Sequence, residues 1–121
     1  PDCPSGLPLI QHSLLLLLDF YREGQLTLET IVDKTSHSLA RIYGIKDRGF
    51  IREDYWADLV LIDLDKTTTV TKDNLLYECA WSPFEGKTFN SMINKTFING
   101  ETVYDNGKLL SQPSGKRIEF L

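Results

Sequence analysis

The chain has 121 residues, 41% of them hydrophobic and 25% charged, with a formal net charge of −4 at pH 7. This length suits one domain with its own core and is short for two domains of ordinary size. The negative charge, without a run of lysines or arginines, argues against a nucleic-acid partner. Cys3 and Cys79 are far apart and lack metal-ligand spacing, so we expect free thiols in a reducing cytoplasm.

The first expected element is a helix over residues 8–23. Pro8 suits a first helical position, where its missing N–H is not needed, and Gly24 suits a left-handed cap at the other end. The five consecutive leucines at 14–18 are too few to span a membrane, which takes ~20 apolar residues. Successive residues rotate by about 100° around a helix, so these leucines need contacts on nearly all sides. The remaining chain offers too few partners, which favours a piece of a larger structure.

A second helix is predicted from Thr27 to Gly44. The Thr27 side chain can accept a hydrogen bond from the first turn of this helix. Apolar residues then recur at a spacing of 3.6 residues, which indicates one packed face. The Ser36-His37-Ser38 segment is a candidate break, because serine side chains offer the backbone alternative hydrogen bonds.

The second half of the chain is predicted to be a small β-sheet. Residues 57–63 form a short apolar run bounded by acids, which is typical of a strand buried on at least one face. A helical turn is expected near residues 75–77. Helices first and a sheet second make the fold class α+β. Further strands are expected at 67–71, 88–98 and 101–104, with positive-φ hairpin turns at Asn99-Gly100 and Asn106-Gly107.

The candidate catalytic side chains all have plainer explanations. His12 lies in an apolar helix without a second His or Cys one turn away, so a structural histidine is favoured over a ligand. His37 is interpreted as a turn or capping residue. Asp58 and Asp63 flank a strand, where solvated or backbone-bonded acids are commoner than a catalytic pair. Glu85 belongs to an aromatic loop that we expect to serve packing.

Several motifs resemble the C-terminal region of the metal-dependent amidohydrolases. Residues 49–63, GFIREDYWADLVLID, resemble the return from the last barrel helices into a small β domain. SPFEG at 82–86, followed by TFING at 96–100, is similar to the dihydroorotase and allantoinase branch. SGLPLIQ at 5–11 resembles the loop that follows the last barrel strand, and ARIYGI at 40–45 resembles a further segment of the family.

The resemblance implies a domain organisation and an activity. Residues 1–48 would be the last loop and helices of a (β/α)8 barrel, and residues 49–121 the C-terminal part of a composite β domain. The parent enzyme would interconvert dihydroorotate and N-carbamoyl-aspartate in pyrimidine biosynthesis, with two divalent metal ions, usually zinc, activating the attacking water. The chain has two histidines and no His-x-His motif. Its catalytic and metal-binding residues would therefore precede Pro1, and the chain alone is expected to be inactive.

Ser5 and Gly6 are the residues for which the resemblance implies substrate binding. A residue without a side chain lets the backbone approach a ligand closely. The alternative interpretation is a flexible linker into the helix that starts at Pro8. The implied partners are the rest of the barrel and a small-molecule substrate, with a homodimer left open and neither nucleic acid nor membrane expected.

Three functions remain open at this point. The first is a dihydroorotase, of which this chain is the C-terminal part. The second is another cyclic amidohydrolase, such as an allantoinase or hydantoinase. The third is a metal-free, dihydroorotase-like scaffold or a free-standing interaction module. A His-x-His motif upstream would favour the enzymes over the scaffold.

Overall fold

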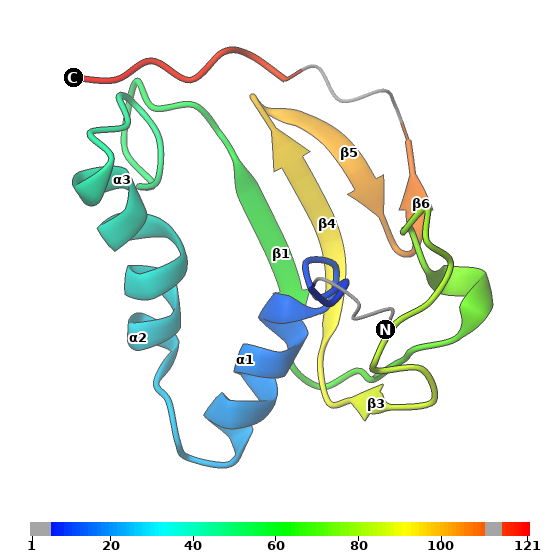
Figure 1. Ribbon diagram of the computed structural model, residues 1–121. Coiled ribbons are helices and arrows are strands. Elements are labelled where there is room, and N and C mark those ends of the chain that lie inside the picture. The colour runs from blue at the N-terminus through cyan, green and yellow to red at the C-terminus, as the bar shows by residue number, and fades with distance from the viewer. Residues whose placement is uncertain (1–5, 111–114) are drawn as a thin grey trace.

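The computed structural model describes residues 6–110 and 115–121, with the helices first and the sheet second (Figure 1). This order confirms the predicted α+β class. The helices are α1 (Ser13–Arg22), α2 (Leu28–Val32), the π-helical turn η1 (Asp33–His37) and α3 (Ser38–Ile42). No helix within the described ranges is long and apolar enough to cross a membrane.

Helix α1 begins later than predicted. The backbone N–H of Gln11 donates to the Tyr77 hydroxyl at 2.8 Å, and residues 10–12 form a turn before the helix starts at Ser13. This contact with a distant segment is invisible to local sequence patterns. Leu15 and Leu18 are buried, whereas the other three leucines of the run are only half-buried. The described chain thus covers one side of α1 completely and the remaining sides in part.

The second helical segment is continuous, and the predicted break in it is a π-helical turn. The cap is confirmed, because the Thr27 side chain accepts from the N–H of Thr30 at 3.2 Å. The prediction for His37 as a turn or capping residue is wrong. His37 has helical backbone angles, and its ring stacks on Phe50 with 4.4 Å between centroids. Gly44 follows the helix with a φ of +60°.

The larger sheet is antiparallel, with strand order β1-β4-β5-β6. Its strands are β1 (Leu59–Asp63), β4 (Met92–Ile98), β5 (Glu101–Asp105) and β6 (Lys108–Leu109). Both predicted hairpin turns have positive φ angles, 52° and 84° at Asn99 and Gly100 and 47° and 92° at Asn106 and Gly107. These residue pairs therefore set the register of the two hairpins.

The strand predicted over residues 88–98 is divided between two sheets. Its start, β3 (Thr88–Phe89), pairs with β2 (Thr68–Thr69), whereas β4 pairs with β1. Ser91 lies at the crossing point, where its carbonyl oxygen accepts from the Thr68 hydroxyl at 2.8 Å. The helical turn expected near residues 75–77 lies earlier, as the 3-10 turn η2 (Lys72–Asn74).

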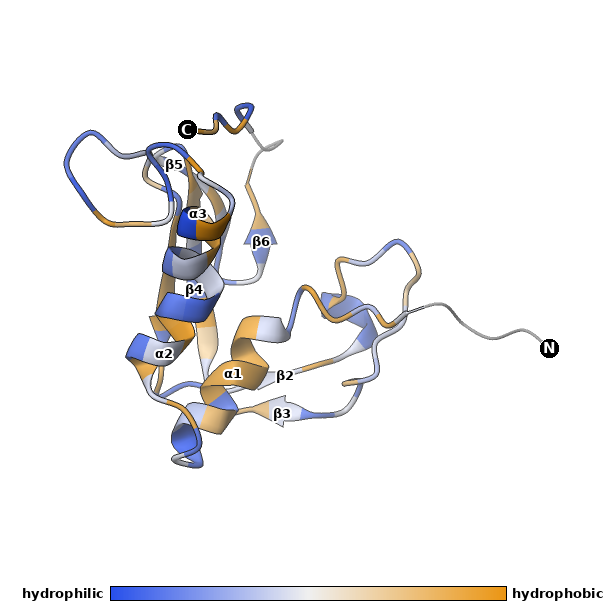
Figure 2. Ribbon diagram, turned by 60° about the vertical axis from the view of Figure 1, so that its left-hand side comes forward, coloured by the Kyte–Doolittle hydropathy of each residue, from blue (hydrophilic) through white to orange (hydrophobic). Residues whose placement is uncertain are grey.

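The core lies between α1 and the small β2–β3 sheet. Leu15, Val70 and Phe89 form its centre, and partly buried apolar side chains such as Phe84 and Ile93 pack around them. Figure 2 shows the largely hydrophobic helix α1 beside β3, with which the helix is in contact. The core thus joins the two halves of the chain.

The prediction that β1 is buried on at least one face is wrong for its first three residues. Leu59, Val60 and Leu61 are 37%, 45% and 51% exposed. The physical reason is that β1 is the edge strand of its sheet, with β4 on one side, and that no described helix packs closely over its faces. An apolar strand that lies open on its other side is a surface on which further protein can pack.

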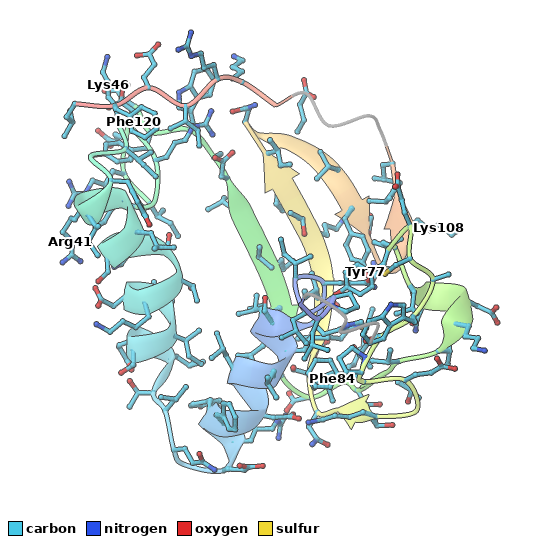
Figure 3. The ribbon with its side chains drawn as sticks, viewed as in Figure 1. Arg41, Lys46, Tyr77, Phe84, Lys108 and Phe120 are labelled. Carbon is cyan, nitrogen blue, oxygen red and sulfur yellow. The ribbon has the colours of Figure 1, made fainter. Side chains whose placement is uncertain are left out.

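Residues 115–121 run back to the end of the helical segment. The N–H of Lys46 donates to the Glu119 carbonyl at 2.9 Å, and the N–H of Leu121 donates to the Gly44 carbonyl at 2.8 Å. Figure 3 shows Lys46 and Phe120 together at this point. The C-terminal residues therefore hydrogen-bond to the segment that follows α3 and do not extend the sheet.

Candidate functional site

The structure describes one of the two predicted substrate residues. Ser5 lies outside the described residues. Gly6 is exposed and has a φ of +97°, and a Cβ added to it would meet nothing within 4 Å. Open space and a left-handed conformation are compatible with close approach of a ligand to this backbone. The binding role of both residues stays a prediction.

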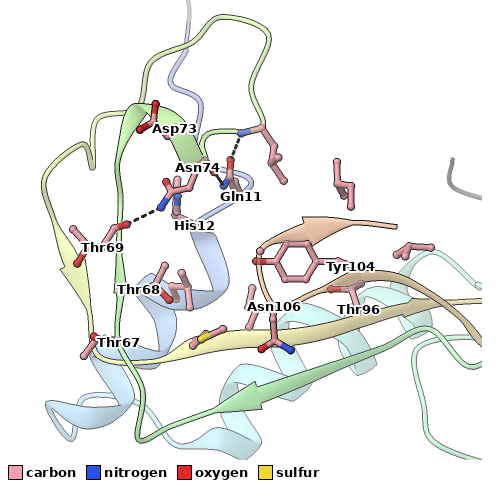
Figure 4. Close-up of a pocket in the computed structure, with 17 residues that line it drawn as sticks. Gln11, His12, Thr67, Thr68, Thr69, Asp73, Asn74, Thr96, Tyr104 and Asn106 are labelled. Carbon is pink, nitrogen blue, oxygen red and sulfur yellow. Dashed lines mark hydrogen bonds between the residues drawn. The ribbon is translucent and has the colours of Figure 1, made fainter. Parts of the chain in front are cut away.

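Gln11 ties the segment after Gly6 to a distant loop. Its side-chain Nε2 donates to the carbonyl oxygen of Asn74 at 2.8 Å, and its Oε1 accepts from the N–H of Leu76 at 2.8 Å (Figure 4). No sequence pattern singles out Gln11 beyond the SGLPLIQ motif that contains it. Its partners lie more than 60 positions away in the chain, so no local pattern could identify them.

His12 is enclosed by aromatic rings and is only 2% exposed. Its ring stacks on Phe89 with a centroid distance of 5.9 Å, and meets Tyr77 and Phe84 edge-on at 6.1 and 6.0 Å. Figure 3 shows Tyr77 and Phe84 beside the start of α1. Burial lowers the pKa of His12 and favours its neutral form, while its Nδ1 is buried without a hydrogen-bond partner. These are the surroundings of a packed, structural histidine.

A pocket of about 570 Å³ opens between the start of α1, the β2–η2 segment and the inner face of the larger sheet (Figure 4). Amide and hydroxyl groups, the His12 imidazole and the Asp73 carboxylate line one part of it, and apolar side chains from β4, β5 and β6 line the rest. Such a lining can hold a polar group against an apolar surface. The polar lining includes Gln11, Thr68, Asn74, Tyr104 and Asn106.

The acids considered as catalytic candidates serve the fold. Asp58 accepts from the N–H of Asn99 at 2.8 Å and pairs with Arg48. Asp63 accepts from the N–H of Asp65 at 2.9 Å, and this bond lowers its pKa. The prediction of backbone-bonded acids is thus confirmed for both. Glu85, in the aromatic loop, is exposed and lies 4.0 Å from the ammonium group of Lys72, a surface ion pair of little strength.

The donor atoms in residues 6–110 and 115–121 do not fit a metal centre. No group of three or more His, Cys, Asp or Glu side chains in these ranges could hold a metal ion. The residues that the structure describes therefore supply no metal centre of their own.

The arrangement of helices and sheet is shared with a solved hydantoinase structure. L-Hydantoinase (dihydropyrimidinase) from Arthrobacter aurescens superimposes with a TM-score of 0.82 and 26% sequence identity, over 91% of this chain and 25% of that one. Residues 18–104 match the model of the amidohydrolase family. The chain belongs to that family.

Relatives of similar sequence cover nearly the whole chain. Dihydroorotase from Pyrococcus furiosus is 33% identical over 114 residues, which are 94% of this chain and 27% of that protein. Allantoinase from Desulfitobacterium hafniense is 36% identical over 114 residues, 93% of this chain and 25% of that protein. The chain therefore spans about a quarter of the length of these relatives.

Proposed function

We propose that the chain is the C-terminal part of a dihydroorotase, a cyclic amidohydrolase that interconverts dihydroorotate and N-carbamoyl-aspartate in pyrimidine biosynthesis. The observation that carries this proposal is the 33% identity to the Pyrococcus furiosus dihydroorotase over 94% of the chain. Residues 1–48 would complete a (β/α)8 barrel, and residues 49–121 would complete a small β domain. The catalytic groups and two divalent metal ions, which we propose to be zinc, belong to the rest of that enzyme.

The exposed apolar surface of the chain supports a larger whole. Strand β1 presents Leu59, Val60 and Leu61 with 37% to 51% of their surfaces exposed. Because successive residues of a strand point to opposite faces, apolar side chains are exposed on both faces of β1, and exposed apolar surface marks a place where further protein packs. We propose that the remainder of the amidohydrolase covers β1 and the half-buried side of α1.

The related activities differ in the ring that they open. The allantoinase of Desulfitobacterium hafniense is as similar in sequence as the dihydroorotases, at 36% identity. The hydantoinase from Arthrobacter aurescens has the same fold in this region, with a TM-score of 0.82. A hydrolase of allantoin or hydantoin is therefore the second candidate, and a non-catalytic scaffold is the third.

A substrate panel on the full-length, metal-loaded protein distinguishes these functions. Dihydroorotate, allantoin, hydantoin and dihydrouracil are supplied in turn, and kcat/KM is measured for each. We expect dihydroorotate to be preferred by ~10-fold or more, the discrimination that one well-placed hydrogen bond provides. Preference for allantoin or hydantoin would favour the second candidate. Folded protein that takes up no metal and turns over none of these substrates would favour the metal-free scaffold.

The role of Gly6 is tested by Gly6→Val in the same enzyme. If its backbone contacts the substrate, the valine should lower kcat/KM by ~10-fold, about the worth of one hydrogen bond. Gly24→Val is the matched control, because Gly24 also has a positive φ, +73°, and open space around it. Equal kinetics in the two variants would remove Gly6 from the site.

A further inference from the structure

We infer that Gln11 is a positioning residue for the proposed substrate loop, residues 6–11, and that it acts by bonding this loop to residues 74–77. The inference rests on the proposed function, because it concerns how that enzyme would hold its substrate loop. Gln11 itself need not touch the substrate.

The loop has few other attachments in the part of the chain that the structure describes. Leu7 and Ile10 are 60% and 85% exposed, and Gly6 has no neighbour within reach of an added Cβ. The carbonyl of Leu9 accepts from the N–H of His12 at 3.1 Å, which is a bond within the same turn. Among the described residues 6–11, Gln11 is the first to bond a segment distant in sequence. Segments with so few contacts open locally unless something restrains them.

Gln11 supplies that restraint with three hydrogen bonds. Its side chain donates to the carbonyl of Asn74 and accepts from the N–H of Leu76, both at 2.8 Å. Its backbone N–H donates to the Tyr77 hydroxyl, also at 2.8 Å. The planar amide matches a carbonyl and an N–H two residues apart, because it carries one acceptor and one donor side by side. Glutamate would keep the acceptor and lose the donor, and methionine would keep the length and lose both.

The segment that receives these bonds is itself anchored. The Asn74 side chain accepts from the N–H of Thr71 at 3.0 Å and donates to the carbonyl of Thr69 at 2.8 Å. Leu75 packs against the core, and the Tyr77 ring meets His12 edge-on. Gln11 therefore joins the exposed loop to a fixed support, as Figure 4 shows for its side-chain bonds.

The experiment measures steady-state kinetics of the full-length, metal-loaded enzyme with dihydroorotate. We expect Gln11→Met to raise KM by ~5- to 10-fold with kcat within ~2-fold, since a loop that is poorly held weakens binding more than chemistry. Gln11→Glu should fall between this variant and the unsubstituted enzyme. Tyr77→Phe removes the hydroxyl and keeps the ring, so it should raise KM by ~2- to 3-fold.

The matched control is Gln25→Met, because Gln25 is exposed and its amide bonds only the neighbouring Glu23 side chain, at 2.6 Å, among the described residues. Its KM should not change. Melting temperature and metal content verify that each variant is folded and loaded. Unchanged KM in Gln11→Met, or a fall in kcat alone, would show a merely structural role and overturn the inference. An unsubstituted enzyme without turnover of any cyclic amide would instead overturn the proposed function, and this inference with it.

Discussion

A Cβ placed on Gly49 would lie 2.5 Å from the Cβ of Ala40, closer than side chains can pack. The loop after α3 therefore lies directly on the helical segment. The Ser36 hydroxyl donates to the Gly49 carbonyl at 3.0 Å, and Phe50 stacks on His37 beside this contact. The close approach sets the direction in which the chain leaves the helices for β1.

Gly49→Ala should destabilise the fold strongly. The φ of +82° strains any side chain by ~1–2 kcal/mol, and the overlap with Ala40 adds ~1–3 kcal/mol. Gly24→Ala is the control, because its φ is also positive, +73°, but an added Cβ meets nothing within 4 Å. The free energy of unfolding, from urea denaturation, should fall by clearly more in Gly49→Ala. Equal losses would show that the loop can move away from the helix.

Asp19 joins α1 to the two residues that flank the strand β3, and its carboxylate should stabilise the fold. Its carboxylate accepts from the N–H of Asn90 at 3.1 Å and lies 3.3 Å from the ammonium group of Lys87. Asp19→Ala leaves both donors without this partner, and we expect a loss of ~1–3 kcal/mol in the free energy of unfolding. Glu85→Ala breaks an exposed pair with Lys72 and should cost less than ~0.5 kcal/mol. Similar losses in the two variants would contradict this difference.

His12 should make stability depend on pH in the mildly acidic range. Burial lowers its pKa below the ordinary value of 6.5, so the unfolded chain takes up this proton more readily than the folded chain. The contribution of neutral His12 to the free energy of unfolding is complete above pH ~6.5 and declines as the pH falls below that value. His12→Phe removes the titration and keeps a ring in place. Urea denaturation between pH ~7 and ~5 should show stability falling more steeply in the unsubstituted chain, and parallel profiles would exclude the effect.

The 121-residue chain on its own should neither hold zinc tightly nor turn over dihydroorotate. The reason is that its described residues contain no cluster of metal-binding side chains. Metal analysis of the purified chain and a direct activity assay measure the two properties. Zinc bound to the chain in a fixed ratio, or any turnover of dihydroorotate by it, would contradict the proposal that the catalytic groups lie outside this chain.

Local chemistry accounts for the elements that sequence patterns predicted. The cap at Thr27 depends on one side chain and the N–H three residues later, at 3.2 Å. The hairpin at Asn99 and Gly100 depends on the tolerance of those residues for positive φ. Because neither feature needs a distant partner, the order of helices, strands and turns follows from the amino-acid sequence by itself.

Features that depend on distant partners were decided by the tertiary structure. The start of α1, the bonds of Gln11 and the stack of His37 on Phe50 all involve groups that local patterns cannot pair. The strand predicted over 88–98 divides because its two ends pair with different strands. The exposure of β1 also depends on which distant parts of the protein pack against it. Its apolar residues specify a strand, but whether they are buried depends on what packs against them, which is a property of the folded assembly.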